Sequence, residues 1–563
     1  MGNTTNKQLV SILVNTLAAK GLKHVVASPG SRNAPLVIAF SRHPEIDIIS
    51  IPDERSAAFF ALGMAQYSNL PTAIICTSGT AGLNYAPAMA EAYYQGIPLM
   101  AITADRPTEY VHQADGQTIN QRNIFKNYVK SSFQFPTDEG HPDNLWHANR
   151  ITNEAYNNCV HPNLGPVHIN VPLREPLYSS ARTNFTARTI DVVMSSQGLY
   201  PETTNSLKRD LFRYKKILIL CGQIRPKEAL ADLVKQASLR SDVAVLSESI
   251  SNFTGENVIP CIDRTLLSIP EERLVDFVPE LLITFDGPVI SKKIKTFLRE
   301  NKVTAHWHIG PNRTDLDTFH SLTKAIVCSR TFFVEEVLNT SKEKNSEYAS
   351  LWHAQFKVSH QKHSTFLETV SFSDLSIFKI IIDHMPNFIH LQLGNSSVVR
   401  YMQLFNHYPK VPQYSNRGTS GIDGCTSTAA GYAHISNEMT LLITGDISFF
   451  YDSNGLWHRH LSPHLRIILI NNGGGGIFNI IEGPNQIKER KDFFIAQQQG
   501  NAKTLCQSYG VEYYRADSTE TLNMTLQDKF YSKSKLPKLL EIFSNEDSGK
   551  VLKAYFKALV KKN

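Results

Sequence analysis

Short apolar runs alternate with segments of helical periodicity through the first third of the chain. Four times, such a run ends in a turn rich in Gly, Ser or Pro, and the turn leads into a helix-like segment. The runs cover residues 23–27, 46–51, 72–76 and 98–103. Strand, turn and helix repeated in this order are typical of a parallel sheet flanked by helices. This unit closes near residues 167–177, and the Ser/Thr-rich sequence after it predicts a linker.

The same alternation occurs twice more along the chain. A second unit has apolar runs at residues 215–222, 242–249, 281–287 and 304–310. A third unit contains runs such as LLITGD and RIILINN. We therefore predict an α/β fold of three domains, each a parallel sheet flanked by helices. The expected domains cover residues 1–185, 186–350 and 351–563.

Composition narrows the class of protein without identifying it. With 42% hydrophobic and 19% charged residues, the 563-residue chain has the composition of an ordinary soluble globular protein. A net charge of +6 without any block of five Lys or Arg residues argues against nucleic-acid binding. Seven scattered cysteines without a CxxC pair predict reduced thiols. We see no signal peptide and no membrane-length apolar run, so we expect a cytoplasmic protein.

Oxygen donors follow two consecutive apolar strands of the third unit. One strand ends at Asp446, and the next ends at Asn472, 26 positions further on, with a predicted helix at Asp452–His460 between them. A crossover of that length places both residues at the carboxyl ends of neighbouring parallel strands, where open sheets bind ligands. A carboxylate, an amide oxygen and a carbonyl from the Gly473–Gly476 run would suit Mg2+ and leave positions for phosphate oxygens. Alternatively, both motifs are simply turns after buried strands.

This pair of motifs resembles the cofactor signature of thiamine-diphosphate-dependent enzymes, in which GD is followed one crossover later by NN. The usual third residue is absent, because Ile447 follows Asp446. The resemblance implies that Asp446, Asn472 and the Gly474 carbonyl bind the metal ion, which is Mg2+ or Mn2+. The remaining cofactor contacts that it implies are Gly421, Ile422 and Gly445. For Ile422, ordinary core packing is an equally good explanation.

Enzymes of this class also need a carboxyl group that exchanges a proton with the aminopyrimidine of the cofactor. Glu54 follows an apolar strand and opens a helix, with Asp53 as its candidate N-cap. Taken alone, Glu54 is better explained as an exposed first-turn acid favoured by the helix dipole. Together with the metal motif, the catalytic role is favoured. In the family the site forms between two chains, so the resemblance implies a homodimer at least, and dimers that pair into a homotetramer remain open.

Seven segments appear in the order of one family of these enzymes. They are SPGSRNAP (28–35), DERSAAFFALG (53–63), TSGTAGLNYAPAMAEAYYQGIPL (77–99), TADRP (103–107), LGNSSVVR (393–400), SNRGTSGIDG (415–424) and NNGGGGIF (471–478). The chain resembles the 2-succinyl-5-enolpyruvyl-6-hydroxy-3-cyclohexene-1-carboxylate synthases (MenD) of menaquinone biosynthesis over nearly its whole length. That resemblance implies a transferase that decarboxylates 2-oxoglutarate, releases CO2 and adds the remaining four-carbon fragment to isochorismate. It also implies pyrimidine-binding, central and diphosphate-binding domains in that order.

Both substrates are carboxylates, which planar arginine side chains bind well. Arg32, Arg106, Arg400 and Arg417 each lie at a predicted strand end or in a Gly-rich turn. Any one of them alone is more simply a solvated surface charge. The resemblance implies that Ser396, Arg400 and Arg417 hold 2-oxoglutarate, and that Ile477 and Phe478 line the site. It also implies that isochorismate and the cofactor are positioned by Ser31, Arg32, Arg106 and Gln117, and it assigns catalytic roles to Glu54, Gln117, Ser31 and Arg32.

Two departures from the family pattern affect this assignment. Gly116 stands before Gln117 where the family commonly has Asn, so one expected amide is missing. In the middle domain, Lys292-Lys293 replaces Lys-Arg, which keeps the charge but loses bidentate geometry. Lys292 is a further candidate substrate-binding residue, although a Lys pair is usually a solvated face.

Three other functions compete with this one. A different thiamine-diphosphate enzyme, for example an acetolactate-synthase-like carboligase, would share the cofactor motif, but the arginines argue against a small neutral acceptor. A nicotinamide-dependent oxidoreductase would need GxGxxG after the first strand, and SPGSRNAP has only one glycine. A catalytically dead relative would not need Glu54, Asp446 and Asn472 together.

Overall fold

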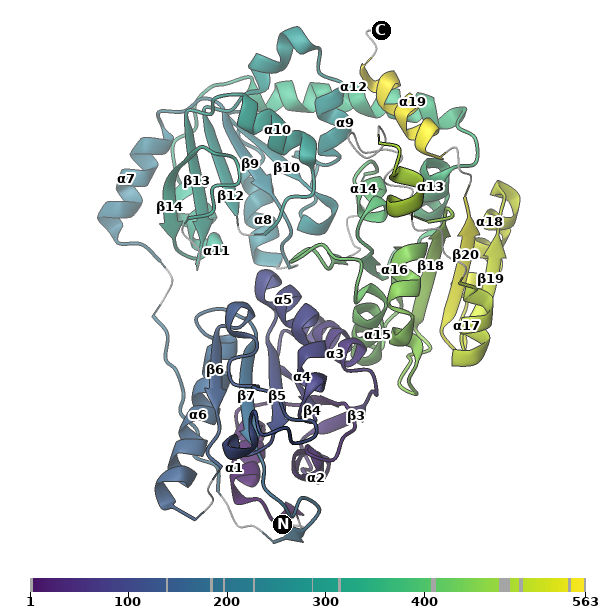
Figure 1. Ribbon diagram of the computed structural model, residues 1–563. Helices are drawn as coiled ribbons and strands as arrows, with labels where there is room; N and C mark the ends of the chain where they lie inside the picture. Colours follow the sequence, from purple (N-terminus) through teal and green to yellow (C-terminus); the bar gives the residue numbers. More distant parts are fainter. Residues whose placement is uncertain are drawn as a thin grey trace.

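A computed structural model of the chain contains three separate six-stranded sheets, and every strand pair within them is parallel. The structure describes residues 4–137, 140–182, 186–195, 198–225, 228–285, 287–311, 315–406, 412–474, 487–495, 500–544 and 548–560. Figure 1 shows the three sheets in one molecule, with the first at the bottom, the second at the upper left and the third at the right. The α/β fold predicted from the sequence is confirmed.

The first sheet begins near the N-terminus. In spatial order its strands are β3 (Asp47–Ser50), β2 (His24–Ala27), β4 (Thr72–Cys76), β5 (Leu99–Asp105), β7 (Val167–Pro172) and β6 (Ser131–Gln134). One face is covered by α1 (Gln8–Ala19), α2 (Ala34–Ser41) and α6 (Pro142–Val160). The other face is covered by α3 (Glu54–Ser68), α4 (Thr80–Asn84) and α5 (Ala86–Gln95). A short antiparallel pair, β1 (Thr4–Thr5) with β8 (Ser180–Ala181), lies outside this sheet.

The second sheet forms the middle of the chain. Its spatial order is β11 (Val258–Ile259), β10 (Val243–Ser247), β9 (Ile217–Cys221), β12 (Leu281–Phe285), β13 (Ala305–Gly310) and β14 (Leu322–Val327). Helices α7 (Pro201–Leu211) and α8 (Glu228–Ala237) pack on one face. Helices α9 (Ile262–Leu267), α10 (Lys292–Glu300) and α12 (Tyr348–Glu368) pack on the other.

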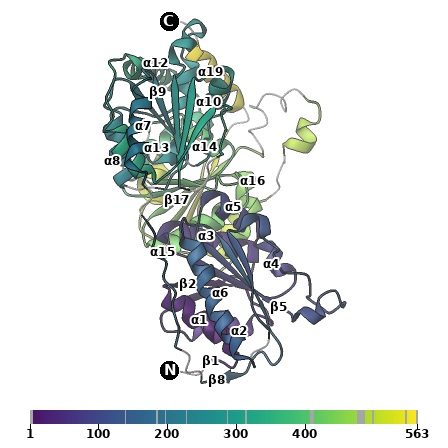
Figure 2. The same cartoon turned by 90° about the vertical axis from the view of Figure 1, so that its left-hand side faces the viewer.

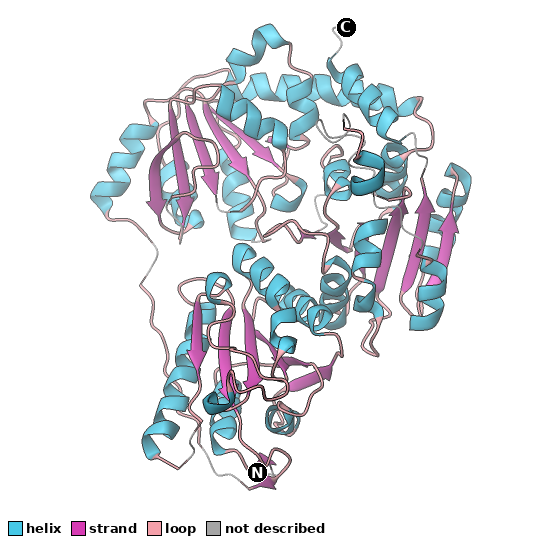
Figure 3. Ribbon diagram, in the orientation of Figure 1, coloured by secondary structure: helices cyan, strands magenta, loops and turns pink. Residues whose placement is uncertain are grey.

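The third sheet has the order β16 (Gln413–Ser415), β15 (His390–Leu393), β17 (Thr440–Gly445), β18 (Leu465–Asn471), β20 (Lys538–Phe543) and β19 (Glu512–Ala516). On one face lie α15 (Cys425–Ser436), α16 (Asp446–Tyr451) and α17 (Ala502–Tyr509). On the other lie α13 (Asp374–His384), α14 (Ser397–Met402), α18 (Thr519–Thr525) and α19 (Ser548–Val560). Figure 3 shows helices on both sides of each sheet.

When the strands of each sheet are numbered from one in chain order, the first and third sheets share the order 2-1-3-4-6-5. The middle sheet has the order 3-2-1-4-5-6, which is known from dinucleotide-binding folds. In all three sheets the strand order reverses beside the first strand. Ligands of open α/β sheets bind outside the carboxyl ends of the strands at such a point.

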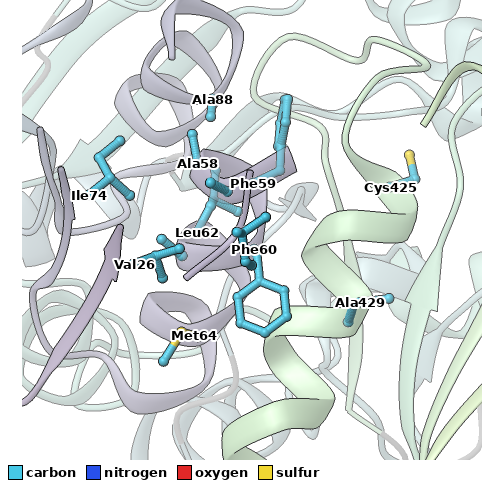
Figure 4. Packing of buried hydrophobic residues seen from close by; sticks show 14 of the residues in the cluster. Val26, Ala58, Phe59, Phe60, Leu62, Met64, Ile74, Ala88, Cys425 and Ala429 are labelled. Atoms are coloured by element: carbon cyan, nitrogen blue, oxygen red, sulfur yellow. The ribbon is translucent and has the colours of Figure 1, made fainter. Parts of the chain in front are cut away.

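A continuous hydrophobic core joins the first and third sheets. Side chains alternate along a strand, so Val26 of β2 faces α3 while Val25 and Ala27 face α1 and α2. Helix α3 also packs against α15 of the third sheet, as Figure 4 shows for Phe60 and Ala429. In the view of Figure 2, the first and middle sheets lie at opposite ends of the molecule, with β17 between them.

Two sequence expectations can be compared directly with these elements. The helix predicted at 452–460 is wrong in its position: α16 starts at Asp446 itself, and a short 3-10 helix follows at Ser453–Leu456. The helix begins early because Gly445, in an extended conformation, turns the chain directly out of β17. All seven cysteines are free and buried, as expected for reduced thiols. Within the described residues, no helix is both long and apolar enough to cross a membrane.

Candidate active site

The predicted metal ligands lie together at the carboxyl edge of the third sheet. Asp446 follows β17, and Asn472 follows its neighbour β18. The Asp446 carboxylate is 3% exposed and accepts hydrogen bonds from the backbone N–H of Ile447 at 2.7 Å and of Gly474 at 2.8 Å. Burial raises the pKa of Asp446, and these backbone donors oppose that shift. The Gly474 amide therefore holds the glycine turn against the carboxylate.

The free oxygen of Asn472 fits a cation site. Its side-chain Oδ1 is buried and has no hydrogen-bond partner among the described residues, while its Nδ2 donates to Asp374 Oδ2 at 3.4 Å. An unpaired buried carbonyl oxygen is costly unless something binds it. A Cβ added to Gly445 or Gly473 would meet no atom of the described residues within 4 Å, so this part of the chain leaves space beside both backbones. The donor set thus matches Mg2+ with phosphate oxygens as further ligands.

The loop that contains Gly421 and Ile422 is hydrogen-bonded to this edge. Ser448 of α16 donates its hydroxyl to the Ile422 carbonyl at 2.7 Å, and Asn395 Nδ2 donates to the Gly421 carbonyl at 2.6 Å. The Ile422 side chain is half-buried rather than part of the core. Core packing alone therefore does not explain an isoleucine at this position.

Ser396, Arg400 and Arg417 come together beside that loop. Arg417 is 8% exposed and donates a hydrogen bond from Nη1 to Asn395 Oδ1 at 3.2 Å. Its buried Nε has no partner within the part of the chain that the structure describes. Arg400 donates to the Ser396 carbonyl at 2.6 Å. Burial lowers the pKa of Arg417, and the positive charge of Arg400 lowers it further. Ser396 adopts φ +69° and ψ −120°, a strained conformation for a residue with a side chain, and such strain clusters at functional sites.

Sequence analysis missed two charged residues around this arginine pair. Glu248, at the end of β10 in the middle domain, is fully buried and accepts the backbone N–H groups of Ile290 and Ser291, both at 2.7 Å. Burial raises the pKa of Glu248 to about 7, and Arg417 opposes the shift. Lys295 of α10 has its pKa lowered by burial, and also by the charges of Arg417 and Arg400. Both residues lie in ordinary sequence, and only the packing of the middle domain against the third brings them here.

The first-domain residues form a second group at the edge of their own sheet. Arg32 follows β2, is 7% exposed, donates to the Leu173 carbonyl at 3.0 Å and pairs with Glu175 at 3.2 Å. Burial lowers the pKa of Arg32, and the nearby positive charge of Arg106 lowers it further. Arg106 follows β5 and pairs with Asp115 at 3.1 Å.

Two polar neighbours complete this first-domain group. Arg106 also donates to the Gly116 carbonyl at 3.1 Å, beside the exposed Gln117. Ser31 is exposed next to Arg32. A Cβ at Gly116 would meet no atom of the described residues within 4 Å, so a side chain could begin at this position without a clash.

Glu54 opens α3 directly after β3. Its neighbour Asp53 caps the helix by accepting the Ser56 N–H at 3.0 Å, as the sequence predicted. Asp53 also accepts from Asn454 Nδ2 at 2.7 Å, which ties the start of α3 to the third domain. The Glu54 carboxyl is half-buried, and burial raises its pKa. A raised pKa suits a group that must exchange a proton near neutral pH.

The remaining candidates lie apart or cannot be placed. Lys292 is exposed at the first position of α10, and Lys293 lies 5.4 Å over the ring of Phe556 in α19. The Lys293 ammonium therefore contacts the C-terminal helix. Ile477 and Phe478, predicted to line the site, lie outside the described residues.

Comparisons with known proteins identify the family of the chain. Residues 7–126 match the model of the thiamine pyrophosphate enzyme, N-terminal TPP binding domain, and residues 193–392 match the middle domain of thiamine pyrophosphate enzymes. Three curated relatives are named 2-succinyl-5-enolpyruvyl-6-hydroxy-3-cyclohexene-1-carboxylate synthase. They are from Porphyromonas gingivalis (39% identical, covering 98% of this chain and 97% of the relative), Flavobacterium psychrophilum (40%, 98% and 98%) and Bacteroides thetaiotaomicron (37%, 99% and 100%).

Proposed function

The chain belongs to the 2-succinyl-5-enolpyruvyl-6-hydroxy-3-cyclohexene-1-carboxylate synthase family of thiamine-diphosphate-dependent enzymes, and from that premise we propose how its own residues perform the reaction. The reaction decarboxylates 2-oxoglutarate and transfers the remaining four-carbon fragment to isochorismate. The relatives favour this function over an acetolactate-synthase-like activity.

A chain of hydrogen bonds between the arginines and the metal edge carries the proposal. Arg417 bonds to Asn395, and Asn395 bonds to Gly421. The next residue, Ile422, bonds to Ser448 of the helix that Asp446 begins. An anionic substrate held by Arg417 and Arg400 would therefore lie in fixed geometry relative to the cofactor end of the site.

The residues divide the work between binding and proton transfer. Asp446, Asn472 and the Gly474 carbonyl would hold Mg2+ or Mn2+ and, through the ion, the diphosphate of the cofactor. Thiamine diphosphate supplies the electron sink for decarboxylation when it is bound. The half-buried Glu54 carboxyl, whose pKa is raised by burial, would hold the proton that the cofactor exchanges, and the half-buried Ile422 side chain would pack against the cofactor.

The substrate side of the site uses hydrogen-bond donors. Arg400, Arg417 and Ser396 bind 2-oxoglutarate, with Lys292 as a weaker candidate. Ser31, Arg32, Arg106 and Gln117 bind isochorismate. The family resemblance implies a site formed between two chains, and on that basis we propose a homodimer. Pairing into tetramers and the cytoplasmic location stay predictions.

The first experiment follows 2-oxoglutarate consumption by the purified protein with thiamine diphosphate and Mg2+, with and without isochorismate. We expect rapid loss of both substrates only when all components are present. Removing the metal with EDTA should stop the reaction, and adding Mg2+ or Mn2+ should restore it. Release of CO2 from pyruvate, with isochorismate ignored, would contradict the substrate assignment and leave the cofactor assignment standing.

A further inference from the structure

A buried glutamate of the first domain holds the turn that presents Arg417 in the third domain. Glu91 lies in α5, in the mainly apolar sequence AMAEAYY, and is 1% exposed. One carboxylate oxygen accepts the Gly418 N–H at 2.7 Å. The other accepts the N–H and the hydroxyl of Thr419, each at 2.7 Å. Both oxygens of this carboxylate thus accept hydrogen bonds from the two residues that follow Arg417, and the first oxygen also accepts one from Gln95 Nε2 of the same helix at 2.5 Å.

The contact leaves the turn little freedom to move. A Cβ added to Gly418 would lie 2.6 Å from the Glu91 carbonyl oxygen, so the two backbones are already at closest approach. The Arg417 N–H donates to the Ser415 carbonyl at 2.9 Å inside the same turn. Gln223 of the middle domain donates to that Ser415 carbonyl at 2.8 Å. The turn before α15 is therefore held from the first and the middle domains at once.

The desolvation cost of the buried Glu91 carboxylate indicates that its role is more than packing between domains. A buried carboxylate is strongly disfavoured unless charge or hydrogen bonds compensate it, and here the donors on the turn provide most of the compensation. The negative charge of Glu91 also opposes the lowering of the pKa of Arg417. An apolar residue would fill the space in α5 without that desolvation cost, but it would leave two backbone N–H groups of the turn unpaired.

We propose that Glu91 is a positioning residue for the 2-oxo acid. By binding both N–H groups of the turn, it fixes the Arg417 guanidinium, whose Nε has no partner in the described ranges, for a carboxylate of 2-oxoglutarate. This inference rests on the substrate-binding role of Arg417 in the proposed function. Glu91 itself does not touch the substrate, so its effect is transmitted through the turn.

The test compares Glu91→Gln with a matched control, Asp452→Asn. Glutamine keeps the shape of the side chain but turns one acceptor into a donor that faces the turn. Asp452, which follows α16, is also a buried carboxylate. It accepts the N–H of Ser427 in α15 at 2.7 Å and the Ser427 hydroxyl at 2.8 Å, and neither of these two hydrogen bonds involves Arg417. Both variants lose hydrogen bonds to a buried carboxylate, but only one of these carboxylates holds the arginine turn.

For Glu91→Gln we expect the KM for 2-oxoglutarate to rise roughly tenfold, the size expected for one lost hydrogen bond to a charged group. The KM for isochorismate and the binding of thiamine diphosphate with Mg2+, measured by tryptophan fluorescence, should stay near the parent values. Asp452→Asn should lower the thermal midpoint without raising the KM for 2-oxoglutarate. Equal rises in both KM values, or an unchanged KM for 2-oxoglutarate, would refute the positioning role.

Two further variants keep the test decisive. Thr419→Ala removes only the hydroxyl bond to Glu91, so it should raise the same KM by a smaller factor even if Glu91→Gln folds poorly. In Arg417→Met, adding Glu91→Gln should raise the KM no further, whereas additive effects would contradict action through Arg417. A parent enzyme that does not consume 2-oxoglutarate would refute the proposed function itself, which separates the two failures.

Discussion

The first and third sheets share one strand order but present different chemistry at the same strand ends. Ser31 and Arg32 follow the first strand of the first sheet, and Ser396 follows the first strand of the third sheet. Glu54 follows the second strand of the first sheet, and Arg417 follows the second strand of the third sheet. The two sheets therefore display candidate functional residues at matching places.

The sheets diverge at the third and fourth strands. The third sheet has Asp446 and Asn472 there, whose oxygens suit a cation. At the matching ends of the first sheet stand Thr77, whose hydroxyl accepts the Arg32 N–H at 3.2 Å, and Arg106. Topology thus supplies equivalent positions, and the residue at each position decides whether the edge suits a cation or an anion.

Replacing Asp446, the proposed cation ligand, should produce the largest loss of cofactor binding and turnover. Asp446→Ala deletes the carboxylate that holds both the proposed ion and the Gly474 turn, so we expect loss of metal-dependent cofactor binding and of turnover. Calorimetric titration of thiamine diphosphate at fixed Mg2+ measures this. Asp452→Asn, a buried carboxylate of the same domain, should keep cofactor affinity. Unchanged affinity in Asp446→Ala would show that Asp446 is not a ligand.

A substitution of Glu54 in the first domain should lower turnover without lowering cofactor affinity. Glu54→Gln removes the proton-exchanging carboxyl, and we expect turnover to fall by roughly 10²–10⁴-fold while cofactor affinity is retained. Asp53→Asn is the neighbouring control, because it perturbs the helix cap and should cost about 1 kcal/mol of stability at most, with little effect on turnover. Near-normal turnover of Glu54→Gln would exclude the proton-exchange role.

Helices α3 and α15 each follow the second strand of their sheet and pack against each other. Substitutions on the two sides of this contact show whether both helices contribute equally to stability. A Cβ on Gly63 of α3 would lie 2.0 Å from the Thr428 carbonyl oxygen, and one on Gly431 of α15 would lie 1.9 Å from the Phe60 carbonyl oxygen. Each Gly→Ala change should therefore destabilise the α3–α15 contact by about 1–3 kcal/mol. Thermal unfolding should give similar shifts for both variants. A tolerated alanine at one site only would show that the contact is asymmetric.

The smallest expected effect is a pH dependence at the same contact. His434 and His458 of the third domain lie with ring centroids 5.4 and 5.0 Å from Phe60 of α3. Burial lowers the pKa of His458 to about 4, and the adjacent His460 lowers it further. The folded state thus binds this proton less readily than the unfolded chain. His458 therefore reduces stability as the pH falls from about 6.5 towards 4.

Thermal midpoints of the parent and of His458→Gln across pH 7.5 to 4.5 isolate this contribution. Several buried carboxyls titrate in the same range with the opposite sign, so the difference between the two proteins is the informative quantity. The parent should lose a few degrees more than the variant on acidification. Parallel curves would show that His458 is not the titrating group.

The alternation of apolar runs was enough to predict the three parallel sheets, because buried strands must be apolar and their helices must cover both faces. The placement of Asp446 and Asn472 on neighbouring strands followed from crossover length alone. Asp53 as the cap of α3 followed from local preferences in the same way. These features depend on residues close together in the sequence, so the sequence determined them.

Contacts between domains could not be predicted in this way. Glu248 and Lys295 lie in unremarkable segments, and Glu91 lies in a family segment whose pattern gives this residue no role. The relation of all three to Arg417 exists only because three domains pack around one turn. The same is true of the unpaired Oδ1 of Asn472, which depends on how β18 ends against α13. Local sequence determines which helices and strands form and which residues stand at their ends. The tertiary structure decides which of those side chains are buried together, because desolvation and hydrogen-bond pairing depend on neighbours distant in the chain.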